Sequence, residues 1–349
     1  MTNSRGVAAR MYRIFVLLLA LAGLATAADT LDIYFVDVEG GAATLMVTPA
    51  GETVLMDAGW LTTENRDAER IRKVLTEQAG ADKIDYLIMS HYHEDHVGGL
   101  PALAGLVPID AFLDHGDSVE LGRELGRSLF QNYLAAADGK RRQVKPGDKL
   151  PLRGVDFLFV TSHSQFIEKP LGPATPNPYC EGAELHRADR SENGKSVGFV
   201  LRFGGFKFID IGDVTWNYEH ELACPVNRLG EADLYQTTHH GMNMSGAPQL
   251  AQAINPTVAV MNNGPTKGGS PEVYQILKRA PDFQDLWQGH YAVNSSAEQN
   301  TGPRLIANLT ETEDCEGHWI KISVRTDGTY TVTNSRNGFS KTYSPRGLP

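Results

Sequence analysis

The sequence has little positive charge, few cysteines and only one apolar run that is longer than a typical strand. Its 349 residues contain 32 lysines and arginines against 42 aspartates and glutamates, so the formal net charge is −10. A surface this acidic repels phosphate backbones unless metal ions or a local basic patch intervene. We therefore do not expect stable nucleic-acid binding.

The apolar run occupies residues 14–25, behind three arginines, and small residues at 25–28 suit signal-peptidase cleavage near Ala27 or Ala28. It is shorter than the ~20 residues that a bilayer span needs, so a secretory signal is favoured over an uncleaved membrane anchor. Loss of residues 1–28 removes three arginines and no acidic residue, which changes the net charge from −10 to −13. The sequence predicts export to the periplasm or the extracellular space, without a membrane segment after cleavage.

The three cysteines are Cys180, Cys224 and Cys315. In an oxidising compartment they allow one disulfide and one free thiol. The sequence leaves all three pairings open, and it leaves the oligomeric state open as well.

The hydrophobic pattern predicts strands that alternate with helices. Apolar runs bounded by turn residues predict strands, and apolar residues at helical spacing predict helices. The predicted strands are 31–38, 43–48, 53–56, 84–89, 109–113, 154–160, 196–203, 206–211, 233–237, 257–261, 319–325 and 329–333. The predicted helices are 66–79, a short one after Gly98-Gly99, 118–137, 248–254 and 271–279. We find no internal linker, so residues 29–349 are expected to form one domain.

One segment, residues 163–195, is irregular and contains four prolines with several glycines. Long loops of this kind in compact domains are usually functional. We expect this 163–195 loop to border the site.

Most of the chemistry is concentrated in residues 91–96, directly after the predicted strand 84–89. His91 and His93 are two apart on extended backbone, so both imidazoles point the same way and can reach one ion. Asp95 and His96 point apart from each other, which suits a loop that serves a second ion. Nitrogen and carboxylate ligands fit zinc best, with iron or manganese as alternatives. A solvated polar loop is the other interpretation, and it leaves this density of imidazoles unexplained.

The pattern His91-x-His93-x-Asp95-His96, followed by Gly98-Gly99 and preceded by Asp57-Ala58-Gly59, resembles the metallo-β-lactamase superfamily of hydrolases. The resemblance covers about residues 30–335 and implies an αββα sandwich, an α/β fold with a dinuclear metal site at its strand ends. Within the superfamily, the segments 37–42, 196–213 and 239–245 resemble the hydrolase domain of the competence-type DNA-uptake channel proteins. Those proteins carry long membrane segments that this chain lacks.

The resemblance implies further ligands. Asp213 matches the aspartate that bridges the two metals, and the last family histidine falls in His239-His240. We favour His240 as the ligand, because it directly precedes a glycine, with His239 then supporting the site or facing substrate. A turn aspartate is the alternative for Asp213, since Gly-Asp at a strand end is common by itself.

One family feature is missing, the histidine of a Pro-Gly-His loop between the 91–96 cluster and Asp213. His163, His186 and Asn193 are the residues near its place, and each is more simply explained without metal binding. If none of them binds, His91, His93 and Asp213 hold the first ion with water. Other candidates to touch substrate are Asn262, Asn263, Lys267 and Trp60, against the alternative that they shape a turn or pack under the pocket. The isolated histidines His115, His220, His290 and His318 are expected at the surface or as partnered core residues.

These features predict metal-assisted hydrolysis with two divalent ions, in which a metal-held hydroxide attacks a carbon or phosphorus centre and Asp95 orients it. Three interpretations compete: an exported phosphodiesterase or nuclease, a hydrolase of small esters, lactones or amides, and a non-catalytic metal-binding scaffold. The acidic charge opposes the first, and the nearly complete ligand set opposes the third. The fold alone cannot choose among them.

Overall fold

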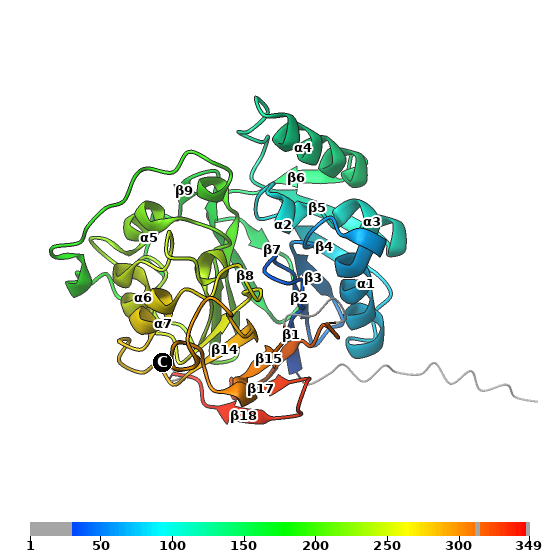
Figure 1. The fold of residues 1–349 in the computed structure, drawn as a ribbon. Coiled ribbons are helices and arrows are strands. Elements are labelled where there is room, and N and C mark those ends of the chain that lie inside the picture. Colours follow the sequence, from blue (N-terminus) through cyan, green and yellow to red (C-terminus); the bar gives the residue numbers. More distant parts are fainter. Residues whose placement is uncertain (1–29, 311–314, 347–349) are drawn as a thin grey trace, which may run out of the picture.

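The structure is a computed structural model that describes residues 30–310 and 315–346 (Figure 1). The expected signal sequence and its cleavage point lie outside these residues. Among the described residues, no helix combines the length and the apolar character that crossing a membrane requires.

The first sheet has the strand order β18-β17-β16-β1-β2-β3-β4-β5-β6. Strands β3 to β6 run parallel, and the pairs from β18 to β3 are antiparallel. The strands are β1 (Thr30–Phe35), β2 (Thr44–Val47), β3 (Thr53–Met56), β4 (Ile84–Ile88), β5 (Ile109–Asp114), β6 (Arg141–Gln143), β16 (Ile320–Arg325), β17 (Tyr330–Asn334) and β18 (Ser340–Tyr343).

The second sheet has the order β15-β14-β13-β12-β11-β10-β8-β7, and β9 pairs with β8. Strands β11 to β15 are parallel neighbours, so their carboxyl ends meet at one edge of the sheet. The strands are β7 (Lys149–Leu150), β8 (Asp156–Ser162), β9 (Gln165–Phe166), β10 (Gly198–Phe203), β11 (Phe206–Asp210), β12 (Leu234–Gln236), β13 (Val258–Met261), β14 (Asp285–His290) and β15 (Ile306–Asn308).

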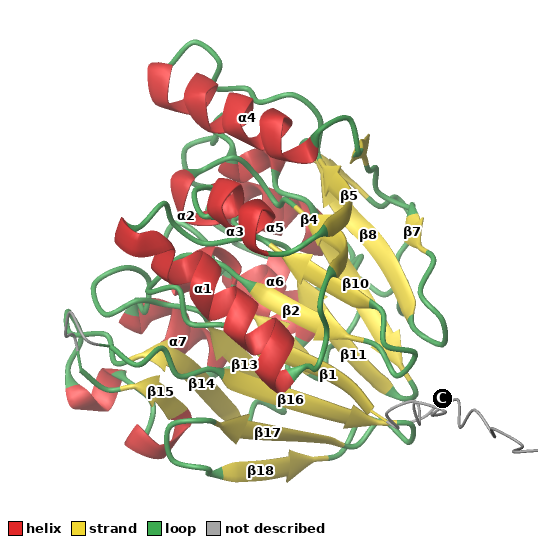
Figure 2. Cartoon of the chain, turned by 90° about the vertical axis from the view of Figure 1, so that its right-hand side faces the viewer, coloured by secondary structure: helices red, strands yellow, loops and turns green. Residues whose placement is uncertain are grey.

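Helices cover the outer face of each sheet (Figures 1 and 2). Apolar side chains of α1 (Arg66–Lys73), α3 (Leu100–Leu106) and α4 (Glu124–Ala137) share a buried cluster with the first sheet. Those of α5 (Trp216–Ala223), α6 (Pro248–Ile254) and α7 (Pro271–Leu277) share another with the second sheet. The predicted αββα sandwich is confirmed.

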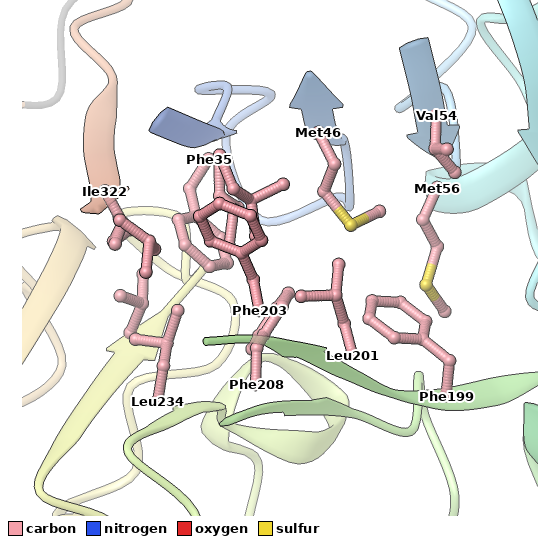
Figure 3. Close-up of a cluster of buried hydrophobic side chains, with 14 of the residues drawn as sticks. Phe35, Met46, Val54, Met56, Phe199, Leu201, Phe203, Phe208, Leu234 and Ile322 are labelled. Carbon is pink, nitrogen blue, oxygen red and sulfur yellow. The ribbon is translucent and has the colours of Figure 1, made fainter. Parts of the chain in front are cut away.

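The largest apolar cluster lies between the two sheets and holds them together. Figure 3 shows Phe35, Met46 and Met56 of the first sheet facing Phe199 and Phe208 of the second. The rings of Phe35 and Phe208 meet edge to face with centroids 6.0 Å apart, a favourable geometry for aromatic pairs. This packing fixes the sheet edges relative to each other, which in turn fixes the residues carried at the strand ends.

The predicted elements recur in the structure, but the strands β6, β7, β9, β14, β15 and β18 were not predicted. The other differences concern helices. Asp95 and His96 lie on a one-turn helix, α2 (Glu94–Val97), rather than in a loop. The helix α5 occupies a stretch that we read as loop, and the predicted helix 118–137 begins only at Glu124. The helix predicted over 66–79 holds, although its last turn, Val74–Gln78, widens to a π-helix.

The structure pairs Cys180 with Cys224 in a disulfide whose Cα atoms are 5.8 Å apart. Cys315 is a free thiol. The bond joins the 163–195 loop to the end of α5, so it anchors the loop that we expect beside the site.

Candidate metal centre

The candidate site lies at the edge where carboxyl ends of strands from both sheets meet. Such edges are where α/β folds usually bind ligands. Asp57 follows β3, His91 follows β4, Asp213 follows β11 and His240 follows β12. The chain therefore assembles the site from segments far apart in the sequence.

Four residues of the site form one compact group, which we call the closed cluster: Asp95, His96, Asp213 and His240. All four are buried, and one ligand atom of each lies within 4.8 Å of the others. His96 Nε2 is 3.1 Å from Asp95 Oδ2, 3.2 Å from Asp213 Oδ2 and 3.2 Å from His240 Nε2. His240 Nε2 is 3.1 Å from Asp95 Oδ2 and 3.3 Å from Asp213 Oδ2.

These spacings fit a single tetrahedral ion. With metal–ligand bonds of about 2.0–2.1 Å, the ligand atoms around zinc stand about 3.3 Å apart. Two imidazole nitrogens and two carboxylate oxygens are also a donor set that zinc accepts. The residues present therefore fit a divalent metal.

The charges of the closed cluster also favour a bound cation. Burial opposes ionisation of Asp95 and Asp213, but His96 and His240 hold the pKa of both carboxyls well below the usual range. Burial opposes protonation of His96, but Asp213, Asp95 and Asp57 raise its pKa well above the usual value. Two buried carboxylates thus draw a positive charge into the cluster, a role that a metal ion can take over.

Asp57 fixes the ring of His96 from behind. Its Oδ2 lies 2.7 Å from His96 Nδ1, and the backbone N–H and hydroxyl of Ser90 donate to the same carboxylate at 2.8 and 2.7 Å. A carboxylate on the far nitrogen of a histidine orients the near nitrogen toward a metal. Asp57 holds φ at +64°, a left-handed conformation that turns its side chain back to the site.

His91 and His93 form a second, looser group, which we call the open side. His91 Nε2 lies 3.1 Å from His93 Nδ1 and 4.0 Å from Asp213 Oδ2. The side chain of His93 is 30% exposed, whereas that of His91 is buried. Burial and the neighbouring His96 lower the pKa of His91 well below its usual value, which keeps its ring neutral.

Glu120 is a site residue that the sequence did not reveal. Its Oε1 lies 3.6 Å from His93 Nε2, on the side of the ring away from His91. Glu120 thus faces the far ring nitrogen of His93, as Asp57 faces the far ring nitrogen of His96, although at a longer distance. No spacing in the sequence connects Glu120 to residues 91–96, so only the folded chain could show it.

His239 and Asn193 lie next to the closed cluster. His239 Nε2 is 3.5 Å from Asp213 Oδ2 and 3.5 Å from Asn193 Nδ2, while its Nδ1 faces Ser245 Oγ at 3.2 Å. Burial lowers the pKa of His239 to about 4, so its ring is neutral. Asn193 is buried, and its Oδ1 has no hydrogen-bond partner among the described residues.

Glu192 positions Asn193. Its carboxylate accepts hydrogen bonds from the Tyr92 backbone N–H at 3.3 Å and from the Ser118 hydroxyl at 2.7 Å, and it faces His115 Nε2 at 2.9 Å. These bonds fasten the end of the 163–195 loop to the segment that carries His91 and His93. The expectation that this loop borders the site agrees with its geometry.

The adjacent residues His239 and His240 share an unusual backbone conformation. His239 and His240 both adopt left-handed conformations, with φ of +55° and +54°. Such strain in two non-glycine residues is uncommon outside functional sites. Gly268 packs against this turn so closely that a Cβ there would lie 2.1 Å from the His240 carbonyl oxygen.

Four other residues that the sequence suggested do not contact the closed cluster: His163, His186, Asn262 and Asn263. His163 stacks near His115, with centroids 5.7 Å apart, and His186 stacks on Trp216 at 4.1 Å, so neither contacts the closed cluster. Asn263 donates to the carbonyl of His290 and shapes its own loop, and Asn262 lies beside it.

Lys267, in contrast, reaches the site. It forms an ion pair with Asp95, and its Nζ lies 4.7 Å from the ring centroid of Trp60. A cation on the rim of the closed cluster is suited to hold an anionic group of a substrate.

A second set of possible ligands, Asp37, His290 and Cys315, lies along the same edge. Here Asp37 is already paired, because Arg70 Nη1 lies 2.9 Å from Oδ2 and His290 Nε2 lies 2.6 Å from Oδ1. His290 is thus a buried core histidine with a partner.

The chain is similar to several known proteins. Residues 36–188 match the model of the metallo-β-lactamase superfamily. A UPF0173 metal-dependent hydrolase of Cupriavidus necator is 25% identical over 244 residues, which cover 68% of this chain and 76% of that protein. A second, of Cupriavidus taiwanensis, is 24% identical over 244 residues, with shares of 68% and 77%. The metallo-β-lactamase fold protein YhfI of Bacillus subtilis is similar with a TM-score of 0.46 at 11% identity, over 84% of this chain and 99% of that one.

Proposed function

We propose that this chain is a metal-dependent hydrolase of the metallo-β-lactamase superfamily that uses two divalent ions, preferably zinc, to cleave an ester or a phosphodiester. The observation that carries the proposal is the closed cluster, whose four ligand atoms have the spacing of one tetrahedral site. The competence-type likeness of the sequence is consistent with a phosphodiester, and it is part of the proposal.

The ligand assignment follows from the contacts. Asp95, His96, His240 and Asp213 would hold an ion in the closed cluster, and His91 and His93 would hold another on the open side together with a shared Asp213. A bound divalent ion supplies a Lewis acid and lowers the pKa of water from 15.7 to about 7.

The surrounding residues of this chain have separate tasks. Asp57 and Glu120 orient the rings of His96 and His93 through the nitrogens that face away from the ions. The buried, ionised carboxylate of Asp95 is placed to accept a hydrogen bond from an attacking water and so to orient it. The neutral ring of His239 and the amide of Asn193 are placed to hydrogen-bond the attacked group, and Lys267 to offset negative charge on it.

We further propose that the protein is exported. The arginines and apolar run at residues 1–28 favour this, and so does the Cys180–Cys224 disulfide, since disulfides persist mainly in oxidising compartments. Cell fractionation with N-terminal sequencing of the isolated protein tests it. A mature N-terminus near residue 28 in the exported fraction is expected, and an intact Met1 in the cytoplasm would contradict it.

The test of the reaction combines metal analysis with parallel assays. Purified protein is analysed for bound zinc, iron and manganese, then assayed with a bis-aryl phosphodiester, a lactone and a cephalosporin reporter. We expect hydrolysis of the phosphodiester that is lost with chelator and restored by zinc. Turnover of the lactone or cephalosporin alone would favour a small-molecule hydrolase, and metal binding without turnover of any substrate would favour a non-catalytic scaffold.

A further inference from the structure

Beside the open side lies a cleft of about 920 Å³ that the ligand residues do not account for. One wall is the segment before α4, and the other is the last part of the 163–195 loop together with Met244. The lining residues are Val119, Glu120, Gly122, Arg123, Arg187, Ala188, Asp189, Arg190, Ser191 and Met244. Its size is that of a ligand site rather than of a packing defect.

The walls of the cleft contact residues of the proposed reaction centre. Glu120, in one wall, contacts His93, and Ser191, in the other, accepts a hydrogen bond from the backbone N–H of Asn193 at 3.3 Å. Met244 comes four residues after His240. A substrate with its scissile group at the metal centre can therefore extend into this cleft.

The cleft carries unused positive charge on a strongly acidic protein. Within the described residues, the guanidinium groups of Arg187 and Arg190 make no ion pair and no hydrogen bond, and both residues are exposed. Arg123 makes only a long contact of 3.5 Å to Glu120. The lining also contains two carboxylates, so three guanidinium groups stand against two carboxylates. Asp189 accepts hydrogen bonds from the Ser191 backbone N–H and the Thr215 hydroxyl, and Glu120 faces His93 and Arg123.

The wall that carries the arginines is held in place. Asn217 of α5 accepts from the His186 backbone N–H at 2.8 Å and donates to the His186 carbonyl at 2.7 Å, and Tyr218 donates to the Asp189 carbonyl at 3.0 Å. The Cys180–Cys224 disulfide ties the loop to the other end of α5. The arginines are thus presented from an anchored segment.

Exposed apolar side chains lie in the same cleft as the arginines. Val119 and Met244 line the cleft and are 42% and 44% exposed, and Leu121 and Leu185 lie exposed on the same two segments. Large apolar side chains that remain exposed together beside a cleft mark a binding surface. The cleft can accept an apolar body as well as an anion.

From these observations we propose that the substrate is a phosphodiester with a second phosphate group, which Arg187 and Arg190 bind while the body between the two phosphates rests on Val119 and Met244. This rests on the proposed function and specifies its substrate. A phosphate monoester carries about −1.5 to −2 charges at pH 7 and so matches two guanidinium groups, whereas a carboxylate carries one.

The experiment uses two substrates that differ only in the second phosphate. These are the 3′-(p-nitrophenyl phosphate) of thymidine with and without a 5′-phosphate, given to the full chain loaded with zinc. We expect kcat/KM to favour the 5′-phosphorylated compound by about tenfold or more, and the Arg187→Gln/Arg190→Gln double variant to lose most of this preference. About 0.5 M NaCl should weaken it too, since salt screens exposed charges.

Arg279→Gln is the matched control. Arg279 is an exposed arginine just after α7, without a side-chain hydrogen bond or ion pair among the described residues, and it lies outside the cleft. This variant should keep the preference of the unmodified protein. Circular dichroism establishes that all variants are folded.

Three results would overturn the proposal: equal hydrolysis of both compounds, a preference that survives in the double variant, or an equal preference for a 5′-carboxylate analogue. If neither compound is hydrolysed, the proposed function fails, and calorimetry then tests the cleft separately. Tighter binding of thymidine 3′,5′-bisphosphate than of thymidine 3′-phosphate, dependent on Arg187 and Arg190, would support the cleft. Equal binding of the two would overturn it.

Discussion

The closed cluster and the open side use the same kinds of ligand but differ in enclosure. Asp95, His96, Asp213 and His240 are buried and bring four ligand atoms within 4.8 Å of one another. On the open side, His91 Nε2 lies 3.1 Å from His93 Nδ1 but 4.0 Å from Asp213 Oδ2, and His93 is partly exposed next to a large cleft. In the proposed function, the closed cluster would therefore retain an ion, and the open side would admit a substrate.

The difference has a structural cause. The closed cluster is held by strand ends of both sheets, with Asp57 fixed behind His96 by two hydrogen bonds from Ser90. The open side borders the 163–195 loop, which supplies Asn193 near the place where most of the superfamily supplies a histidine. An amide is a weaker zinc ligand than an imidazole or a carboxylate. We therefore expect the two ions to bind with different affinities.

The largest effect should come from Asp213→Asn, because Asp213 contacts both halves. The substitution keeps the shape but removes the charge that attracts both ions. We expect loss of bound metal and a fall in kcat of at least about 10³-fold, which equals roughly 4 kcal/mol of transition-state stabilisation. Mass-spectrometric metal analysis and steady-state kinetics measure both.

Asp210→Asn is its control. Asp210 is equally buried on the preceding strand, and burial raises the pKa of its carboxyl to about 7, so that much of it is already neutral near neutral pH. This variant should retain its metal. Full metal content in Asp213→Asn would contradict the shared role of Asp213.

The next effect separates the two halves directly. His240→Ala removes a ligand of the closed cluster and should lower metal content below one ion per chain. His93→Ala should leave one tightly held ion and lower kcat, because the open side then keeps only one of its two imidazole ligands. If both variants lose metal equally, the two halves are not independent and the comparison fails.

The closed cluster should also show a pH dependence that the open side lacks. In the metal-free protein the raised pKa of His96 keeps a proton on its ring, and an incoming ion must displace that proton. Affinity for the first zinc should therefore rise with pH until it passes this raised pKa, and then level off. His91 has a lowered pKa and carries no proton to displace.

Calorimetric zinc titrations of chelator-treated protein, in buffers of different ionisation enthalpy, count the protons released at each step. We expect release with the first equivalent and little with the second. Equal release in both steps would remove the distinction.

The sequence predicted the site residues that share a local pattern and missed one that only the fold brings to the site. The spacing within residues 91–96 is local, so it indicated candidate ligands before any fold was known. Asp213 and His240 came only through the resemblance, because nothing in their own neighbourhoods marks them. Glu120 has no local signature at all, and its contact with His93 exists only after α4 and the 163–195 loop have packed.

The secondary structure was predicted where apolar periodicity was strong and missed where it was weak. The helix α5 carries polar residues on most of its surface and buries few apolar side chains. A one-turn helix such as α2 is too short to show any period. The strands β14 and β15 are short and each ends in a polar residue, His290 facing the buried Asp37 and Asn308 donating to the carbonyl of His318.

The smallest effect, and the one that sharpens the comparison most, is expected from Asn193→Asp. The two side chains have the same shape, but the aspartate adds a negative charge at a buried position whose Oδ1 has no partner among the described residues. If the open side is weak because it lacks a ligand there, the carboxylate should tighten the second zinc by up to about tenfold, or ~1.4 kcal/mol, without changing the first. Asn193→Ala should not tighten it, and Asn177→Asp, a buried asparagine of the same loop outside the centre, should leave both zinc affinities as they are. A second affinity that stays the same in Asn193→Asp would mean that the openness beside His93 comes from the cleft itself and not from the missing ligand.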